Sequence, residues 1–207
     1  MIVRRWDLEY RGTSGLRTAA ALPLSVQLWC ALLDAGPTLA LDVGASYGAF
    51  TLAGRYLRGS RCLAFEPHPQ VVRCLRQSVR EHPDAERITV YAAAVSDTSG
   101  PGWLQIDTLK SGCSSLHAHP RRRGPLTRQA IARLRLDQAV MRRPGEACLL
   151  KSDTEGHEGQ VLLGARGLLG AGPVTGLIEC APDLLAAAEE SVASLLAALP
   201  AAAARWW

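Results

Sequence analysis

Thr38-Leu39-Ala40-Leu41-Asp42-Val43-Gly44-Ala45-Ser46-Tyr47-Gly48 is the stretch of sequence that decides the fold. Its first six residues form a short apolar run, which is typical of a strand buried on both faces of a parallel sheet. The glycines Gly44 and Gly48 follow, and without side chains they let the backbone approach a ligand closely. We expect a helix over residues 50–57 after this turn, with its first N–H groups available to a carboxylate or a phosphate.

The rest of the chain alternates between strand and helix patterns. Apolar runs bounded by turn residues predict core strands at residues 61–65, 88–93, 147–152 and 174–178, and an exposed strand at 131–136. Periodic apolar positions predict helices at residues 24–33, 69–80, 158–169 and 183–199. This alternation predicts an α/β fold with a doubly wound, Rossmann-like, mostly parallel sheet.

Four of the predicted core strands end in an acid at or just beyond the last strand residue. These acids are Asp42, Glu66, Asp153 and Glu179. Ligands of doubly wound sheets bind at the carboxyl ends of the strands, so the four acids predict a binding site at that edge. Glu66 follows Asp42 by 24 positions and is placed to accept both hydroxyls of a ribose.

The turn after the first strand is not a dinucleotide fingerprint. Ser46 stands where GxGxxG has its second glycine, which a pyrophosphate needs for close approach. A nicotinamide-dependent reductase is therefore disfavoured. A ligand that carries a carboxylate and an ammonium fits the turn better, with Asp42 serving the ammonium directly or through water.

Three motifs make the resemblance to a known family specific. Leu41–Thr51 (LDVGASYGAFT), Phe65–Pro69 (FEPHP) and Leu150–Glu158 (LKSDTEGHE) resemble the motifs of the FkbM methyltransferase family, whose third motif has the form Lys-x-Asp-x-Glu-Gly-x-Glu. Ser114–Leu116 and Leu136-Asp137 resemble weaker blocks of that family. The resemblance implies methyl transfer from S-adenosylmethionine, commonly to a hydroxyl of a sugar, a polyketide or another natural product.

The resemblance also implies roles for residues in the motifs. The methionine part of the donor would be held by Asp42, Gly44, Ala45 and Gly48, and the ribose by Glu66. Ser96 and Asp97, after the third strand, would lie near the adenine.

Methylation of a hydroxyl requires in-line approach of the oxygen and removal of its proton. Asp153 or Glu155 could act directly as the base. Alternatively, Asp153, Glu155 and Glu179 could hold a divalent cation such as Mg²⁺ that acidifies the hydroxyl. Lys151 shares a strand face with Asp153 and could orient the substrate or form a salt bridge with the acids.

The outer segments complete the predicted organisation. Residues 1–37 are expected to form an N-terminal helical segment that covers the substrate, and residues 38–207 the methyltransferase domain. The loop at residues 103–128 would contribute to the same cover. A typical methyltransferase sheet continues with a reversed hairpin, for which the residues after 178 leave little room. The open sheet edge could be covered by the first segment or by a second copy of the chain in a homodimer.

Composition narrows the expected partners. The net charge of +4 is mild, and the run Arg121-Arg122-Arg123 lacks interleaved aromatics, so no nucleic acid is expected. Cys113, His117 and His119 are interpreted as part of a surface loop rather than a zinc site. No secretory signal or membrane span is recognised, which predicts a cytoplasmic protein acting on a small molecule. N-methylation and a catalytically degenerate S-adenosylmethionine-binding module remain alternatives, and acids facing the transferable methyl would argue against the module.

Overall fold

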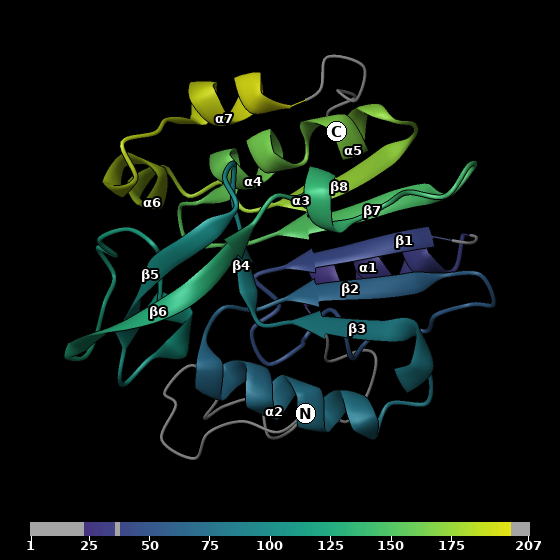
Figure 1. Ribbon diagram of the computed structural model, residues 1–207, viewed down its shortest axis with the longest axis horizontal. Coiled ribbons are helices and arrows are strands. Elements are labelled where there is room, and N and C mark those ends of the chain that lie inside the picture. The colour runs from purple at the N-terminus through teal and green to yellow at the C-terminus, as the bar shows by residue number, and fades with distance from the viewer. Residues whose placement is uncertain (1–22, 36–37, 200–207) are drawn as a thin grey trace.

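The computed structural model describes residues 23–35 and 38–199, which form two sheets with helices packed around the larger one (Figure 1). The strands are β1 Thr38–Val43, β2 Arg61–Phe65, β3 Ile88–Tyr91, β4 Ala93–Val95, β5 Gly100–Asp107, β6 Leu126–Leu134, β7 Ala147–Ser152 and β8 Val174–Ile178. The main sheet has the order β3-β2-β1-β7-β8, and all its strands are parallel. The smaller sheet has the order β4-β6-β5, with β4 parallel and β5 antiparallel to β6.

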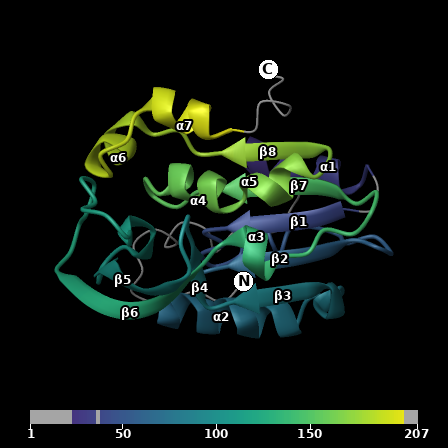
Figure 2. The ribbon, with the colours of Figure 1, turned by 45° about the horizontal axis from the view of Figure 1, so that its top comes forward.

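Helices lie on both faces of the main sheet (Figure 2). They are α1 Leu24–Leu33, α2 Pro69–Arg80, α3 Leu136–Ala139, α4 Glu158–Gly164, α5 Arg166–Gly170, α6 Pro182–Ala187 and α7 Val192–Ala198, with 3₁₀ turns η2 Ala85–Arg87 and η3 Ser111–Cys113. Helices α1 and α2 pack on one face, and α3, α4 and α5 pack on the other. The predicted doubly wound, mostly parallel α/β fold is confirmed.

Strand β1 lies at the centre of the core because all six of its residues are buried. Leu39 and Leu41 point toward the cluster that contains Leu162 of α4, whereas Ala40 points toward the cluster that contains Trp29 of α1. The period of two in a strand sends neighbouring side chains to opposite faces, so an apolar run is what a strand covered on both faces requires.

The start of helix α2 is fixed by its first residues. The Nδ1 atom of His68 accepts the N–H of Gln70 at 3.2 Å, and Pro69 occupies the first turn, where its missing N–H costs nothing. Val72, Leu75 and Val79 then bury one stripe of the helix, as the sequence predicts. This places the N-terminal end of α2 beside Glu66 at the end of β2.

The predicted helix at residues 50–57 is wrong. Residues 46–53 form consecutive turns, because Gly48 has a φ of +90° that a right-handed helix cannot contain. The carboxylate of Asp42 also binds both the N–H and the hydroxyl of Thr51, at 3.1 and 2.6 Å. These two bonds fix Thr51 within the turns that follow β1.

Four other predictions about the secondary structure are corrected. The region expected to be irregular contains β5, whose opening Gly100-Pro101-Gly102 has the composition of a turn, and β6 begins five residues earlier than the predicted exposed strand at residue 131. The helix expected at residues 158–169 is split into α4 and α5, and the one expected at 183–199 into α6 and α7. The second split falls near Glu189, which has a φ of +60°.

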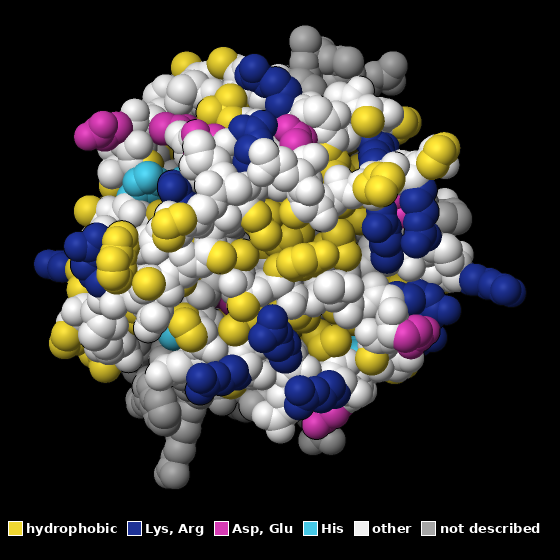
Figure 3. All heavy atoms as spheres, viewed as in Figure 1, with side chains coloured by type: hydrophobic (Ala, Val, Ile, Leu, Met, Phe, Trp, Pro, Cys, Tyr) yellow, Lys and Arg dark blue, Asp and Glu magenta, His cyan; other side chains and the backbone are white. Residues whose placement is uncertain are grey.

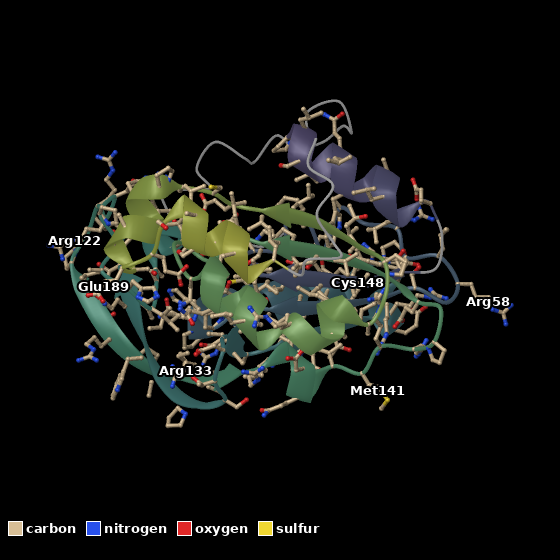
Figure 4. All side chains as sticks on the ribbon, turned by 90° about the horizontal axis from the view of Figure 1, so that it is seen from above. Arg58, Arg122, Arg133, Met141, Cys148 and Glu189 are labelled. Carbon is tan, nitrogen blue, oxygen red and sulfur yellow. The ribbon has the colours of Figure 1, made fainter. Side chains whose placement is uncertain are left out.

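The face shown in Figure 3 carries apolar side chains in its middle, over the strands that no helix covers in this view of Figure 1. The rings of Phe65 and Tyr91 stack with their centroids 4.9 Å apart. In Figure 4, Arg122 and Glu189 lie at one end of the molecule, and Arg58 and Met141 lie at the other. The described residues after β8 form helices and no further strand, and no described helix has the length and apolarity to cross a membrane.

Candidate functional site

A cavity opens at the carboxyl ends of β1, β2 and β7, where the order of the main sheet reverses direction. The space it encloses, with the open solvent at its mouth included, is about 890 Å³. The opposite wall is formed by the smaller sheet and by the loop between β5 and β6. The residues that line the cavity are Val43–Ser46, Ala49, Phe50, Phe65–Pro67, Val71, Ala93–Val95, Leu104, Ser111, Gly112, Ser114–Leu116, Lys151, Asp153–Glu155 and His157.

The glycine turn lines this cavity, but its glycines are required by the protein's own packing. A Cβ on Gly44, whose φ is +73°, would lie 1.9 Å from the carbonyl oxygen of Asp153. A Cβ on Gly48 would lie 2.6 Å from Leu75, and Gly48 does not line the cavity. The glycines thus allow the turn to pack against the end of β7 and against α2.

The expected anion site at a helix N-terminus is not formed. No helix begins after the turn, and the N–H groups of Gly44 and Ala45 both donate to the carbonyl of Phe65 at 3.0 Å. The N–H of Ser46 donates to Glu66 at 2.8 Å. These three N–H groups already have partners. A ligand beside the turn would therefore contact its side chains and carbonyl groups and not unpaired N–H groups.

Glu66 is buried at the end of β2 and lines the cavity. Its Oε2 accepts the N–H of Ser46 and its Oε1 accepts the N–H of His68 at 2.7 Å. Each carboxylate oxygen keeps a second lone pair for a ribose hydroxyl. Burial raises the pKa of Glu66 to about 7, even though the two N–H bonds and the charge of Lys151 favour the ionised form.

Asp42 and Lys151 form a buried ion pair beneath the turn. Asp42 is fully buried and lies outside the cavity lining, and its Oδ1 is 3.5 Å from the Nζ of Lys151. The same Nζ donates to the carbonyl of Gly44 at 2.7 Å and lies 5.3 Å from the ring centre of Phe50. Burial lowers the pKa of Lys151, but the carboxylates of Asp42, Asp153 and Glu66 outweigh that effect and raise it. Lys151 therefore stays charged at the floor of the cavity.

Asp153 and Glu155, the two candidate bases, both line the cavity. Asp153 Oδ2 is 3.7 Å from the Nζ of Lys151, and Glu155 Oε2 is 2.8 Å from the Nε2 of His119. Glu179 lies behind them, outside the lining. Burial and the charges of Asp153 and Glu155 raise the pKa of Glu179 to about 8.

The magnesium site expected at Asp153, Glu155 and Glu179 is not supported. Across residues 23–35 and 38–199, no group of three or more His, Cys, Asp and Glu side chains is arranged to hold a metal ion. The oxygens of Asp153 and Glu155 instead face the Nζ of Lys151 and the ring of His119. We therefore derive no step through a metal.

Ser96 and Asp97 lie behind the cavity wall rather than in it. The preceding residues, Ala93–Val95, line the cavity, because β4 runs along it. The hydroxyl of Ser96 donates to Asp97 at 3.0 Å and lies 3.1 Å from the Nε2 of His157, which does line the cavity. Burial lowers the pKa of His157 to about 4, so this ring is neutral near pH 7.

His117 and His119 were expected to lie in a surface loop, whereas the structure buries His119 and places both histidines beside the site. His119 is buried against Glu155, and the Nε2 of His117 is 2.8 Å from the Nδ1 of His157. The partners lie 36 and 40 residues away along the chain, so their local sequence gives no sign of the contact. The resemblance of Ser114–Leu116 to a family block was the available signal, and those residues do line the cavity.

The N-terminal helix does not cover the site. Trp29 and Leu33 of α1 are fully buried against the main sheet, and no residue from 23 to 35 lines the cavity. The part of the expected cover formed by residues 1–22 and 36–37 lies outside the described residues. Residues 103–128 were the second segment expected to cover the substrate. Of these, the residues that line the cavity are Leu104, Ser111, Gly112 and Ser114–Leu116.

Comparison with known proteins places the chain in a family. Residues 42–185 match the methyltransferase FkbM domain family. A crystal structure of methyltransferase FkbM from Methylobacillus flagellatus KT aligns with a TM-score of 0.47 and 21% identity, over 68% of this chain and 32% of that chain. This chain thus spans about a third of that protein's length. No curated protein matches the sequence. The family match covers more than half of the chain and includes all three motifs except Leu41, so the chain belongs to the FkbM methyltransferase family.

Proposed function

We propose that this protein transfers the methyl group of S-adenosylmethionine to a hydroxyl of a small molecule. The observation that carries the proposal is one cavity lined both by Glu66 and the glycine turn and by two candidate bases, Asp153 and Glu155. Membership of the FkbM family supports methyl transfer as the reaction.

The residues present fit S-adenosylmethionine as the donor. Glu66 offers two carboxylate oxygens for the ribose hydroxyls. Phe65, Val71 and Ala93–Val95 give an apolar wall for the adenine. Gly44 and Ala45 line the adjoining part of the cavity for the methionine, with Lys151 and Asp153 as its charged partners. When bound, S-adenosylmethionine supplies a methyl group activated by a sulfonium.

The protein's own residues account for the remaining chemistry. Glu155 accepts the proton of the acceptor hydroxyl, a task suited to a carboxylate within hydrogen-bond reach of the bound acceptor. Leu104 and Leu116 line the same cavity with apolar side chains, which would keep water away from an acceptor bound beside them. The buried charge of Lys151 holds the carbonyls of Val43 and Gly44 in place, at 3.3 and 2.7 Å. This keeps the glycine turn in one geometry.

Cofactor binding is the first test. Isothermal titration with S-adenosylhomocysteine should give saturable binding, and Glu66→Gln should weaken it by about tenfold or more, since charged hydrogen bonds contribute roughly 1.5–3 kcal/mol. Glu81→Gln, at an exposed position after α2, is the matched control and should bind like the native protein. Tight binding of NADH without any response to S-adenosylhomocysteine would refute the proposal.

The acceptor is tested separately. A panel of sugars, polyketides and amines is incubated with methyl-labelled S-adenosylmethionine, and labelled products are separated by mass. Label on a hydroxyl oxygen is the expected result, and its loss in Glu155→Gln would support a base at this position. Label found only on nitrogen would select the N-methyltransferase alternative.

A further inference from the structure

Two side chains of the loop that follows β5 hold Glu155 in place. The hydroxyl of Ser115 donates to the main-chain carbonyl of Glu155 at 2.9 Å. The Nε2 of His119 lies 2.8 Å from the Oε2 of Glu155. The loop therefore fixes both the backbone and the side chain of a residue that lines the cavity.

The protonation of the His119 ring follows from its second contact. The N–H of Arg121 donates to the Nδ1 of His119 at 3.1 Å, so this nitrogen carries a lone pair. In a neutral ring the proton is then on Nε2, which donates to the carboxylate of Glu155. The side chain of His119 is 2% exposed and that of Glu155 is 24% exposed. Burial of the ring shields this hydrogen bond from water.

The backbone of Glu155 is strained, which indicates that its side chain is held for a purpose. Its φ of +57° is left-handed, a conformation that costs a residue other than glycine about 1–2 kcal/mol. Gly156 follows with a φ of +96°, and there a Cβ would lie 2.6 Å from the carbonyl of Leu184. Strained residues persist where surrounding contacts over-determine them, and such residues gather at active sites.

We propose that His119 is the positioning residue of Glu155: its Nε2–H holds the Glu155 carboxylate in the orientation that faces the transferred methyl group. His119 does not line the cavity, so it acts through Glu155 and not on the substrate. The inference rests on the proposed function, because it assigns Glu155 to the methyl-transfer end of the cavity.

A pair of donor analogues tests the orientation without any acceptor. Sinefungin carries an amine where S-adenosylmethionine carries its methyl group, and S-adenosylhomocysteine carries nothing there. A carboxylate held toward that position should favour sinefungin, so the ratio of the two dissociation constants reports on Glu155. Isothermal titration gives both constants for each variant.

Two substitutions at His119 distinguish a role in orienting Glu155 from a purely structural role of the ring. His119→Gln keeps an N–H donor at the end of the side chain, whereas His119→Asn keeps an acceptor for the N–H of Arg121 but cannot supply the donor at Nε2. We expect Glu155→Gln to reduce the preference for sinefungin about tenfold, as for loss of one charged hydrogen bond. His119→Asn should reduce it by several-fold, and His119→Gln should stay close to the native ratio. The dissociation constant for S-adenosylhomocysteine should stay within about twofold of the native value in all three single variants.

The double variant His119→Asn/Glu155→Gln completes the cycle. Its ratio should equal that of Glu155→Gln, because a positioning residue has no effect once its partner is gone. A native ratio in His119→Asn, with a reduced ratio in Glu155→Gln, would overturn the role of His119 and leave the proposed function intact. A ratio unchanged by Glu155→Gln would overturn both residues' roles at the methyl end. Failure of the native protein to bind S-adenosylhomocysteine would refute the proposed function itself, and the inference with it.

Discussion

Glu66 joins the glycine turn to helix α2 through one carboxylate, and the burial of this carboxylate makes stability depend on pH. Its pKa is raised from an ordinary 4.5 to about 7, mainly by burial. An acid with a raised pKa stabilises the fold fully below pH 4.5, and that contribution is lost as the pH rises through 7. The loss amounts to about 3 kcal/mol for a shift of this size.

We therefore predict that Glu66→Gln flattens the pH profile of stability. The native protein should lose free energy of unfolding between pH 4 and pH 8, and the variant should lose about 3 kcal/mol less over the same range. Urea unfolding at several pH values measures this, with Glu81→Gln as the control. Glu179, with a pKa raised to about 8, also lowers stability as the pH rises. This effect is present in both proteins, so it cancels when their pH profiles are compared. Parallel profiles for Glu66→Gln and the native protein would contradict the prediction.

The buried charges of Asp42 and Lys151 stabilise the fold only while both are present. The two residues are 0% and 4% exposed, so neither can recover its hydration if its partner is removed. We predict that Asp42→Asn lowers the free energy of unfolding by about 3 kcal/mol, the usual cost of breaking a buried pair. Adding Lys151→Met should recover part of the loss, because the unpaired charge is then gone. If the double variant is less stable than Asp42→Asn, the buried charge is not the cause.

Among the elements, the short helices at the C-terminal side are interrupted by a strained residue. Glu189 follows α6 with a φ of +60°, and it is exposed. Glycine adopts this conformation without steric cost, although it also loses more entropy on folding. We predict that Glu189→Gly raises the free energy of unfolding by about 0.5–1 kcal/mol. Thermal unfolding checks the sign, and Glu189→Ala, which keeps the strain, should give no increase.

The sequence predicted the central elements well for a physical reason. Thr38–Val43 and Ala147–Ser152 are apolar because both faces are covered, and this pattern is visible without knowledge of the fold. Helix α2 was equally clear, since its apolar stripe and Pro69 are both local signals. Elements whose determinants lie within the segment itself could be predicted.

The elements that were missed depend on distant contacts. Residues 50–57 have a helical composition, but residues 46–53 form turns in which the carboxylate of Asp42, nine positions before Thr51, binds the N–H and the hydroxyl of Thr51. Strand β5 opens with Gly100 and Pro101, and it exists because it pairs along its whole length with β6. Likewise, the sequence around His119 shows only a histidine in a loop, and its contact with Glu155 forms only in the folded chain. Such pairings are set by tertiary structure and leave no local pattern.

For the whole molecule, the cavity connects the two sheets. Gly44 and Glu66 come from the main sheet, and Leu104 and Ser115 come from the smaller sheet and the loop beside it. A ligand that fills the cavity should therefore stabilise both sides at once.

Hydrogen exchange measures this coupling. Saturating S-adenosylhomocysteine should slow amide exchange in residues 43–50 and also in residues 104–116. Helix α1, which does not line the cavity, serves as the internal reference and should be unchanged. Protection limited to residues 43–50 would show that the smaller sheet is not part of the ligand site.

One of the two connections between the sheets consists of a single residue. Ala92 alone separates β3 of the main sheet from β4 of the smaller one, and the next three residues are the cavity wall. Inserting or deleting a single amino acid here would shift β4 by one position against β6 and exchange the side chains that β4 presents on each of its two sides. The length of this connection therefore sets which residues form the inner surface of the cavity.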